Sequence, residues 1–113
     1  MKHSEIKFKV SLDKDNVPEK ITWEADESPT GKAEPATAIN LSIWEPEQKG
    51  TLRIDLWTKE MATIEMKKFY IDTIGGMADS IKRATGDEFM YEKMNDLCVE
   101  LAKHLAEESK MEQ

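Results

Sequence analysis

Apolar and polar side chains alternate strictly through the first half of the chain, and this alternation limits the fold more than any other feature. In EIKFKVSL, residues 5–12, Ile6, Phe8 and Val10 lie on one side of an extended backbone, and charged or hydroxyl side chains lie on the other. A period of two is typical of a strand with one buried face. The period recurs three more times, so we predict strands at about residues 4–12, 19–26, 36–45 and 50–57.

Turn residues divide these four segments into two hairpins. The polar stretch DKDNVPE connects the first pair of strands, and EPEQKG, with Pro46 and Gly50, connects the second pair. Between the hairpins, ESPTGKAEPA is the longest irregular segment that we expect. Because every strand has one apolar and one polar face, we predict one four-stranded antiparallel sheet that is covered on one side.

The second half of the chain has the spacing of amphipathic helices. Apolar side chains recur every three or four residues from Thr63 to the glycine at position 86, and again from Asp87 onward. We predict two helices, at about residues 63–85 and 87–108, both packed on one face of the sheet. Strands followed by helices in a chain of 113 residues indicate a two-layer α+β fold and a single domain over residues 1–113.

Two adjacent glycines stand at the centre of the first predicted helix, in YIDTIGGMADSI. Each glycine costs a helix interior about 1 kcal/mol relative to alanine, so Gly75 and Gly76 require an explanation. One explanation is close packing of the helix backbone onto the sheet or the second helix. The other is a local break or groove that admits a side chain of a partner. Both explanations remain open from the sequence.

Charge and cysteine content exclude several classes of partner. The formal net charge is −7, whereas binding to a nucleic-acid backbone or an anionic membrane surface requires clustered lysine and arginine. No apolar stretch is long enough to span a bilayer, and the charged start of the chain contains no apolar leader. The single cysteine, Cys98, permits no disulfide within the chain. We therefore expect a cytoplasmic protein that neither binds nucleic acid nor inserts into a membrane.

Residue patterns that carry catalysis or metal binding are not found in the sequence. The two histidines, His3 and His104, do not form a pair at helical spacing, and the sequence contains neither an HExxH motif nor a cluster of cysteine and histidine. Cys98 lies among the apolar positions of the second helix, and the sequence places no histidine base beside it. The stretches TGKA and DKDN lack residues that define a phosphate loop and a calcium loop. We expect no catalytic residue, no metal and no cofactor, and hence no enzyme.

Two tryptophans depart from the inward apolar pattern of the third and fourth strands. Trp44 and Trp57 have the opposite parity from their apolar neighbours. If Ile43 lies near Leu52, the two tryptophans stand at opposite ends of the uncovered face, with Arg53 between them. Exposed tryptophan and arginine are enriched in interaction hot spots. Either Trp44, Arg53 and Trp57 form an interaction surface, or neighbouring side chains and the strand ends shield the two rings.

Four segments of the chain carry a resemblance to a known family. SEIKF, NVPEKITWEADESP, RIDLWTKEM and MKKFYIDTIGGMADSIKRAT, in this order, closely resemble the gliding motility protein GldC family of Bacteroidetes. The resemblance extends from Ser4 into the second predicted helix. It implies a small soluble accessory protein of the gliding machinery, which in those bacteria is tied to a dedicated secretion system. It implies no enzymatic activity, no cofactor and no catalytic residues.

These observations favour a non-enzymatic accessory or adaptor protein of gliding motility that acts through protein–protein interaction. The first candidate surface consists of Trp44, Arg53 and Trp57, and the second contains Gly75 and Gly76. Components of the gliding or secretion machinery are the expected partners, and a second copy of the chain could also bury the open sheet face. The alternative function is a small-molecule or lipid-binding module with a cavity of a few hundred Å³ between sheet and helices.

Overall fold

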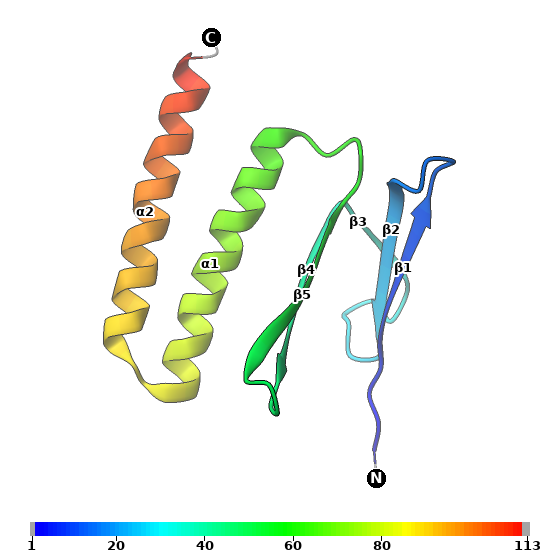
Figure 1. Cartoon of the computed structure of the whole chain (residues 1–113), viewed down its shortest axis with the longest axis horizontal. Helices are drawn as coiled ribbons and strands as arrows, with labels where there is room; N and C mark the ends of the chain where they lie inside the picture. Colours follow the sequence, from blue (N-terminus) through cyan, green and yellow to red (C-terminus); the bar gives the residue numbers. More distant parts are fainter. Residues whose placement is uncertain (1, 112–113) are drawn as a thin grey trace. The chain divides into compact units, whose positions relative to one another are not determined.

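The computed structural model describes residues 2–111 and has an α+β architecture, as predicted. Five strands precede two helices, and the chain divides into two compact units on either side of Met61 (Figure 1). The first unit contains all five strands, in two antiparallel sheets. The second unit is a pair of long helices. The prediction of one domain with both helices on one sheet face stays a prediction.

The first sheet contains three antiparallel strands in the order β1-β2-β3. They are β1 (Ile6–Leu12), β2 (Pro18–Ala25) and the short β3 (Glu34–Ala36). Phe8 lies opposite Trp23 and Val10 lies opposite Ile21, so the alternating apolar residues share one face. The third strand was missed by the sequence prediction because it has three residues, one of them Pro35. Proline is tolerated on an edge strand such as β3, where no further strand needs its missing N–H.

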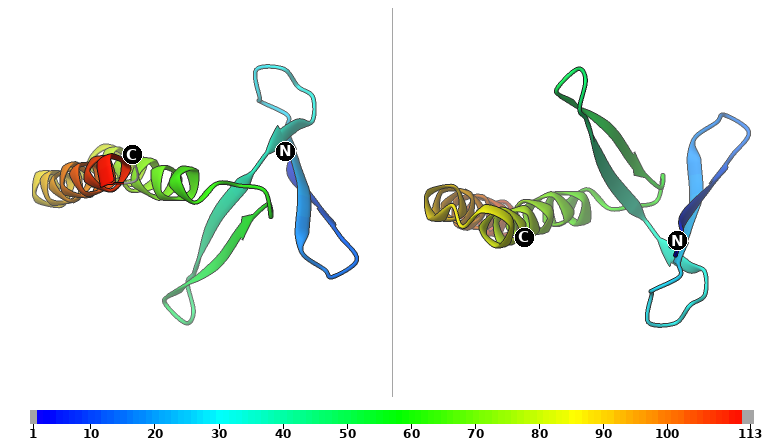
Figure 2. Two further views of the ribbon diagram at one scale, coloured as in Figure 1. Left: turned by 90° about the horizontal axis from the view of Figure 1, so that it is seen from above. Right: turned by 90° about the horizontal axis from the view of Figure 1, so that it is seen from below.

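The second sheet contains only β4 (Ala38–Glu45) and β5 (Gly50–Trp57). Both predicted hairpins are present, β1 with β2 and β4 with β5, and the count of four strands in one sheet was approximate, since five strands form two sheets. The chain bends at Thr37, where β3 ends and β4 begins, and its hydrogen-bonding partner changes there from β2 to β5. The Thr37 carbonyl already accepts the N–H of Thr58, at 2.8 Å. Figure 2 shows the two hairpins diverging from this bend.

Lys59 connects the turn after β1 to the segment after β5. Its Nζ lies 3.1 Å from Asp13 Oδ2, and its N–H donates to the Pro18 carbonyl at 3.0 Å. The Asp13 carboxylate also accepts the N–H groups of Val17 and Asp15, which closes the hairpin turn. The Val17 N–H and the Lys59 ammonium keep the pKa of Asp13 below its ordinary value. DKDN thus forms a turn held by its own aspartate.

The second unit consists of α1 (Thr63–Thr85) and α2 (Glu88–Met111), which run antiparallel to each other (Figure 1). Gly86 ends α1 in the left-handed conformation, with φ of 73°, and its N–H donates to the Lys82 carbonyl. Asp87 begins α2 because its Oδ1 accepts the N–H of Met90 at 3.0 Å. These two adjacent residues stop one helix and start the next, and the helices can therefore pack side by side.

Few side chains of the described residues are fully buried. Ile21 of β2 is 1% exposed, Ala78 of α1 and Leu105 of α2 are buried, and Thr58 is the buried polar residue. Ile21 lies on the central strand, opposite Val10 on one side and Ala36 on the other. Many large apolar side chains on both units remain exposed. This distribution makes the strand faces and the helix surfaces the places to look for binding.

Candidate interaction surface

The β4–β5 hairpin places the three predicted residues of the first surface on one face. Its register is the expected one, with Ile43 opposite Leu52. We call this side the tryptophan face: it contains the residues of even number on β4 and odd number on β5, namely Ala38, Asn40, Ser42, Trp44, Thr51, Arg53, Asp55 and Trp57. Trp44 lies opposite Thr51 at one end, and Trp57 lies opposite Ala38 at the other.

Both tryptophans of this face are accessible to solvent. Trp44 is 62% exposed and Trp57 is 45% exposed. Neighbouring side chains therefore do not shield the Trp44 ring, and they shield the Trp57 ring only in part. Exposed indole rings offer a large apolar area together with one N–H donor, the combination that protein interfaces favour.

A carboxylate between the tryptophans was not singled out from the sequence. Asp55 Oδ2 lies 3.0 Å from a guanidinium nitrogen of Arg53, so the arginine is already paired within its own strand. Asp55 Oδ1 is buried and has no hydrogen-bond partner within residues 2–111. Leaving a buried acceptor unpaired costs about 1–3 kcal/mol. This oxygen is shielded from solvent, so a donor from another molecule does not reach it in this conformation.

The opposite face of β4–β5 is aliphatic except for the pair Glu45 and Gly50 next to the turn. It contains Ile39, Leu41, Ile43, Leu52, Ile54 and Leu56. From the alternation we expected this face to be buried between a single sheet and the two helices. In the structure Ile43, Leu52 and Ile54 are exposed. The hairpin therefore has aliphatic side chains on one face and tryptophans on the other.

The second candidate segment, with Gly75 and Gly76, lies within an unbroken α1. The helix does not break there, so the groove is what remains of the second explanation. A Cβ added at Gly75 would lie 3.9 Å from Cys98 Sγ of α2, which is ordinary van der Waals contact. A Cβ added at Gly76 would meet no atom within 4 Å. Close packing against α2 therefore requires neither glycine, and close packing onto the sheet stays a prediction.

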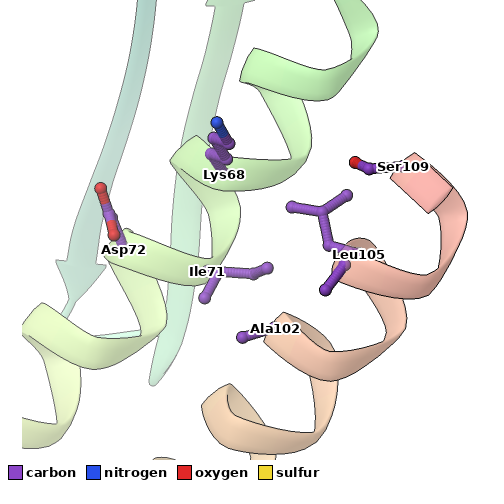
Figure 3. A pocket seen from close by; sticks show the side chains of 7 residues that line it. Lys68, Ile71, Asp72, Ala102, Leu105 and Ser109 are labelled. Atoms are coloured by element: carbon purple, nitrogen blue, oxygen red, sulfur yellow. The ribbon is translucent and has the colours of Figure 1, made fainter. Parts of the chain in front are cut away.

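Two open grooves lie on the surface of the helix pair. One, of about 490 Å³, contains Gly76 and is lined by Asp79, Lys82, Arg83 and Tyr91. The other, of about 360 Å³, follows the seam between the helices, where Ile71 and Leu105 point toward one another (Figure 3). Lysine, aspartate and serine side chains stand at its rim (Figure 3). The groove at Gly76 is the structural feature that supports the second candidate surface.

Substitution of the two glycines should have opposite effects on stability. Gly76→Ala is expected to raise the free energy of unfolding by about 1 kcal/mol, because alanine favours the helix and its methyl group meets nothing. Gly75→Leu is expected to lower it by about 1–3 kcal/mol, because the larger side chain overfills the seam at Cys98. Urea unfolding followed by circular dichroism measures both changes. A destabilising Gly76→Ala would contradict this interpretation and reveal a close approach to Gly76.

A comparison with known protein families matches residues 18–107 to the family described as gliding motility-associated protein GldC-like. The chain belongs to the GldC-like family. The resemblance noted in the sequence is thereby confirmed, and the description associates the family with gliding motility rather than with a reaction. Neither the curated proteins nor the solved structures contain a match.

The match to the GldC-like family spans both candidate surfaces. It begins at Pro18, the first residue of β2, and extends through most of α2. RIDLW, with Arg53 and Trp57, forms the larger part of β5, and DTIGGM lies in the middle of α1. The segment SEIKF, in and before β1, precedes the matched residues.

An ion pair connects α1 and α2 on the surface of the helix pair. Glu108 of α2 accepts from Lys67 of α1 at 2.7 Å, and His104 lies 3.0 Å from the same carboxylate. The Lys67 ammonium, more than His104, keeps the pKa of Glu108 below its ordinary value. Within residues 2–111, no group of three or more histidine, cysteine or acidic side chains is arranged to hold a metal ion. None of the described helices is long and apolar enough to cross a membrane.

Proposed function

We propose that this GldC-like protein is a non-enzymatic accessory protein of bacterial gliding motility that binds a protein partner through its tryptophan face. The observation that supports the proposal is the pair of exposed tryptophans on one face of the β4–β5 hairpin. We place this interaction in the cytoplasm, where an unpaired thiol such as Cys98 is common. Components of the gliding or secretion machinery are the partners that we expect.

The chemistry of the tryptophan face defines the partner that would fit it. Trp44 and Trp57 require apolar recesses, because burial of the rings in fitted pockets supplies most of the binding free energy of such anchors. A net charge of −7 attracts a basic partner and accelerates its encounter with the protein. The partner is therefore a protein surface with two apolar recesses and a positive rim.

Photocrosslinking in gliding cells tests this proposal directly. A photoreactive phenylalanine analogue replaces Trp44 or Trp57, and Phe89 of α2, which is 69% exposed, serves as the matched control position. We expect one discrete adduct from positions 44 and 57 and no such adduct from position 89. The captured protein should itself be required for gliding. Identical adducts from all three positions, or none from 44 and 57, would overturn the proposal.

The alternative function, a small-molecule or lipid-binding module, stays a prediction. Both grooves described above are open to solvent along the surface of the helix pair. Binding sites for small molecules enclose most of the ligand surface. The tryptophan face is therefore the stronger basis for a function.

A further inference from the structure

One edge of β4 has no strand beside it. β4 pairs with β5 on one side, and within the described chain no other strand pairs with Ala38–Glu45. The hydrogen bond from the Thr58 N–H to the Thr37 carbonyl shows which residues of β4 direct their backbone groups toward β5. Residues of odd number on β4 therefore bond to β5, and those of even number direct their N–H and C=O groups to the free edge. None of these even-numbered residues is proline, so the free edge presents a complete set of donors and acceptors.

The free edge of β4 lacks the devices that normally protect an edge strand from pairing. Residues 38–44, AINLSIW, contain no charged residue, no proline and no glycine. Natural edges are guarded by charges, by proline or by being very short. The other edge strands of the described chain have such guards: β1 contains Lys7 and Lys9, β3 has three residues with Pro35, and β5 contains Arg53 and Asp55. β4 is therefore the edge most open to a further strand.

The sequence of β4 is complementary to itself in the antiparallel direction. In a pair of β4 strands centred on Leu41, Leu41 lies opposite Leu41 of the second copy, and Ile39 lies opposite its Ile43. On the other face Asn40 lies opposite Ser42 of the second copy, and no charged side chain faces a like charge. A twofold axis relates two such strands, as is usual in a dimer. We propose that β4 pairs with β4 of a second copy in this register, and forms a four-stranded sheet in the order β5-β4-β4-β5.

Pairing of the two β4 edges converts two separate two-stranded hairpins into one four-stranded sheet. An isolated two-stranded hairpin is marginally stable in water, whereas three or more strands with an apolar face are stable. In the proposed register the aliphatic faces of both copies lie on the same side and become continuous. The tryptophan faces join on the other side and remain open, since edge pairing uses backbone groups. The proposal goes beyond the function proposed above, and its tests need no partner.

Disulfide trapping tests the register. In a Cys98→Ser background, Leu41→Cys places two thiols across the twofold axis on Cα atoms about 4.5–5.5 Å apart, which suits a disulfide. Ile43→Cys is the matched control. Position 43 lies opposite position 39 of the second copy, so the two introduced thiols are offset by four residues along the strands, or about 13 Å. Under mild oxidation we expect a disulfide-linked dimer from Leu41→Cys and none from Ile43→Cys. Equal linkage of the two variants would overturn the register.

Sedimentation across a wide concentration range tests whether the edge makes the dimer. Ser42→Pro removes an N–H that points to the free edge and does not bond to β5, while Ser42→Ala keeps it. We expect dimers from the native chain and from Ser42→Ala, and a dissociation constant raised about 100-fold for Ser42→Pro, because the symmetric dimer loses two hydrogen bonds. Circular dichroism reports whether the variants fold.

A second variant keeps the test decisive if Ser42→Pro does not fold. Asn40→Lys combined with Ser42→Lys sets lysines of one copy against lysines of the other, without altering a backbone group. A monomeric double-lysine variant would support the proposal. A native chain that stays monomeric at every concentration, or a folded edge variant that dimerises like the native chain, would overturn it.

Discussion

Replacing Trp44 and Trp57 together with serine is expected to weaken partner binding by about 1000-fold or more and to stop gliding, while the protein stays folded. Hot-spot tryptophans contribute about 2 kcal/mol or more each, and two such losses correspond to this factor. Loss of the more exposed Trp44 ring should change the free energy of unfolding by about 0.5 kcal/mol, and loss of the half-buried Trp57 ring should lower it by about 1–3 kcal/mol, which a protein of ordinary stability tolerates. Binding of the crosslinked partner to the purified variant, gliding of cells that carry it and urea unfolding measure the three quantities, and protein abundance in those cells is the control.

Phe89→Ser is the matched control for the loss of an exposed aromatic ring. Phe89 lies on α2, away from the β4–β5 hairpin in sequence, and is 69% exposed. This variant should glide normally. Unfolding of the double tryptophan variant would show that the tryptophan face belongs to the interior. Normal gliding with a folded, abundant double variant would remove the tryptophan face from the proposed function.

Ile21→Ala should cause the largest loss of stability of any single substitution in the first unit. Ile21 is the largest fully buried side chain of the described residues, at 1% exposed, and lies on the central strand of its sheet. Truncation of a buried isoleucine leaves a cavity and costs about 2–5 kcal/mol. In a protein of ordinary stability this change removes a large share of the free energy of unfolding. Urea unfolding at one protein concentration measures the difference.

Ile6→Ala provides the control because it lies on the same face of the same hairpin. Ile6 is opposite Ala25 and is 65% exposed, so its truncation should cost about 0.5 kcal/mol. The ratio of the two losses is the informative quantity. Equal losses would contradict the prediction and show that β1 is covered as completely as β2.

The part of the candidate surface that depends on the alternation of side chains along a strand could be predicted from the sequence. Trp44, Arg53 and Trp57 lie on one face because side chains alternate along a strand, and the register with Ile43 opposite Leu52 follows from the length of the turn. The role of Asp55 could not be predicted, because an unpaired carboxylate oxygen is defined by atoms from several residues in space. The environment of Gly76 likewise depends on side chains of both helices.

The sequence by itself determined the faces of the strands, the helix range of α1 and the stop at Gly86, because these depend on side-chain period and on local backbone preference. Only the tertiary structure decided that the strands divide at Thr37 into two sheets and that β3 exists. Only the tertiary structure decided, too, that one edge of β4 is free. Which strand pairs with which depends on hydrogen bonds between residues far apart in the chain, and the period of a strand is the same whichever neighbour it has.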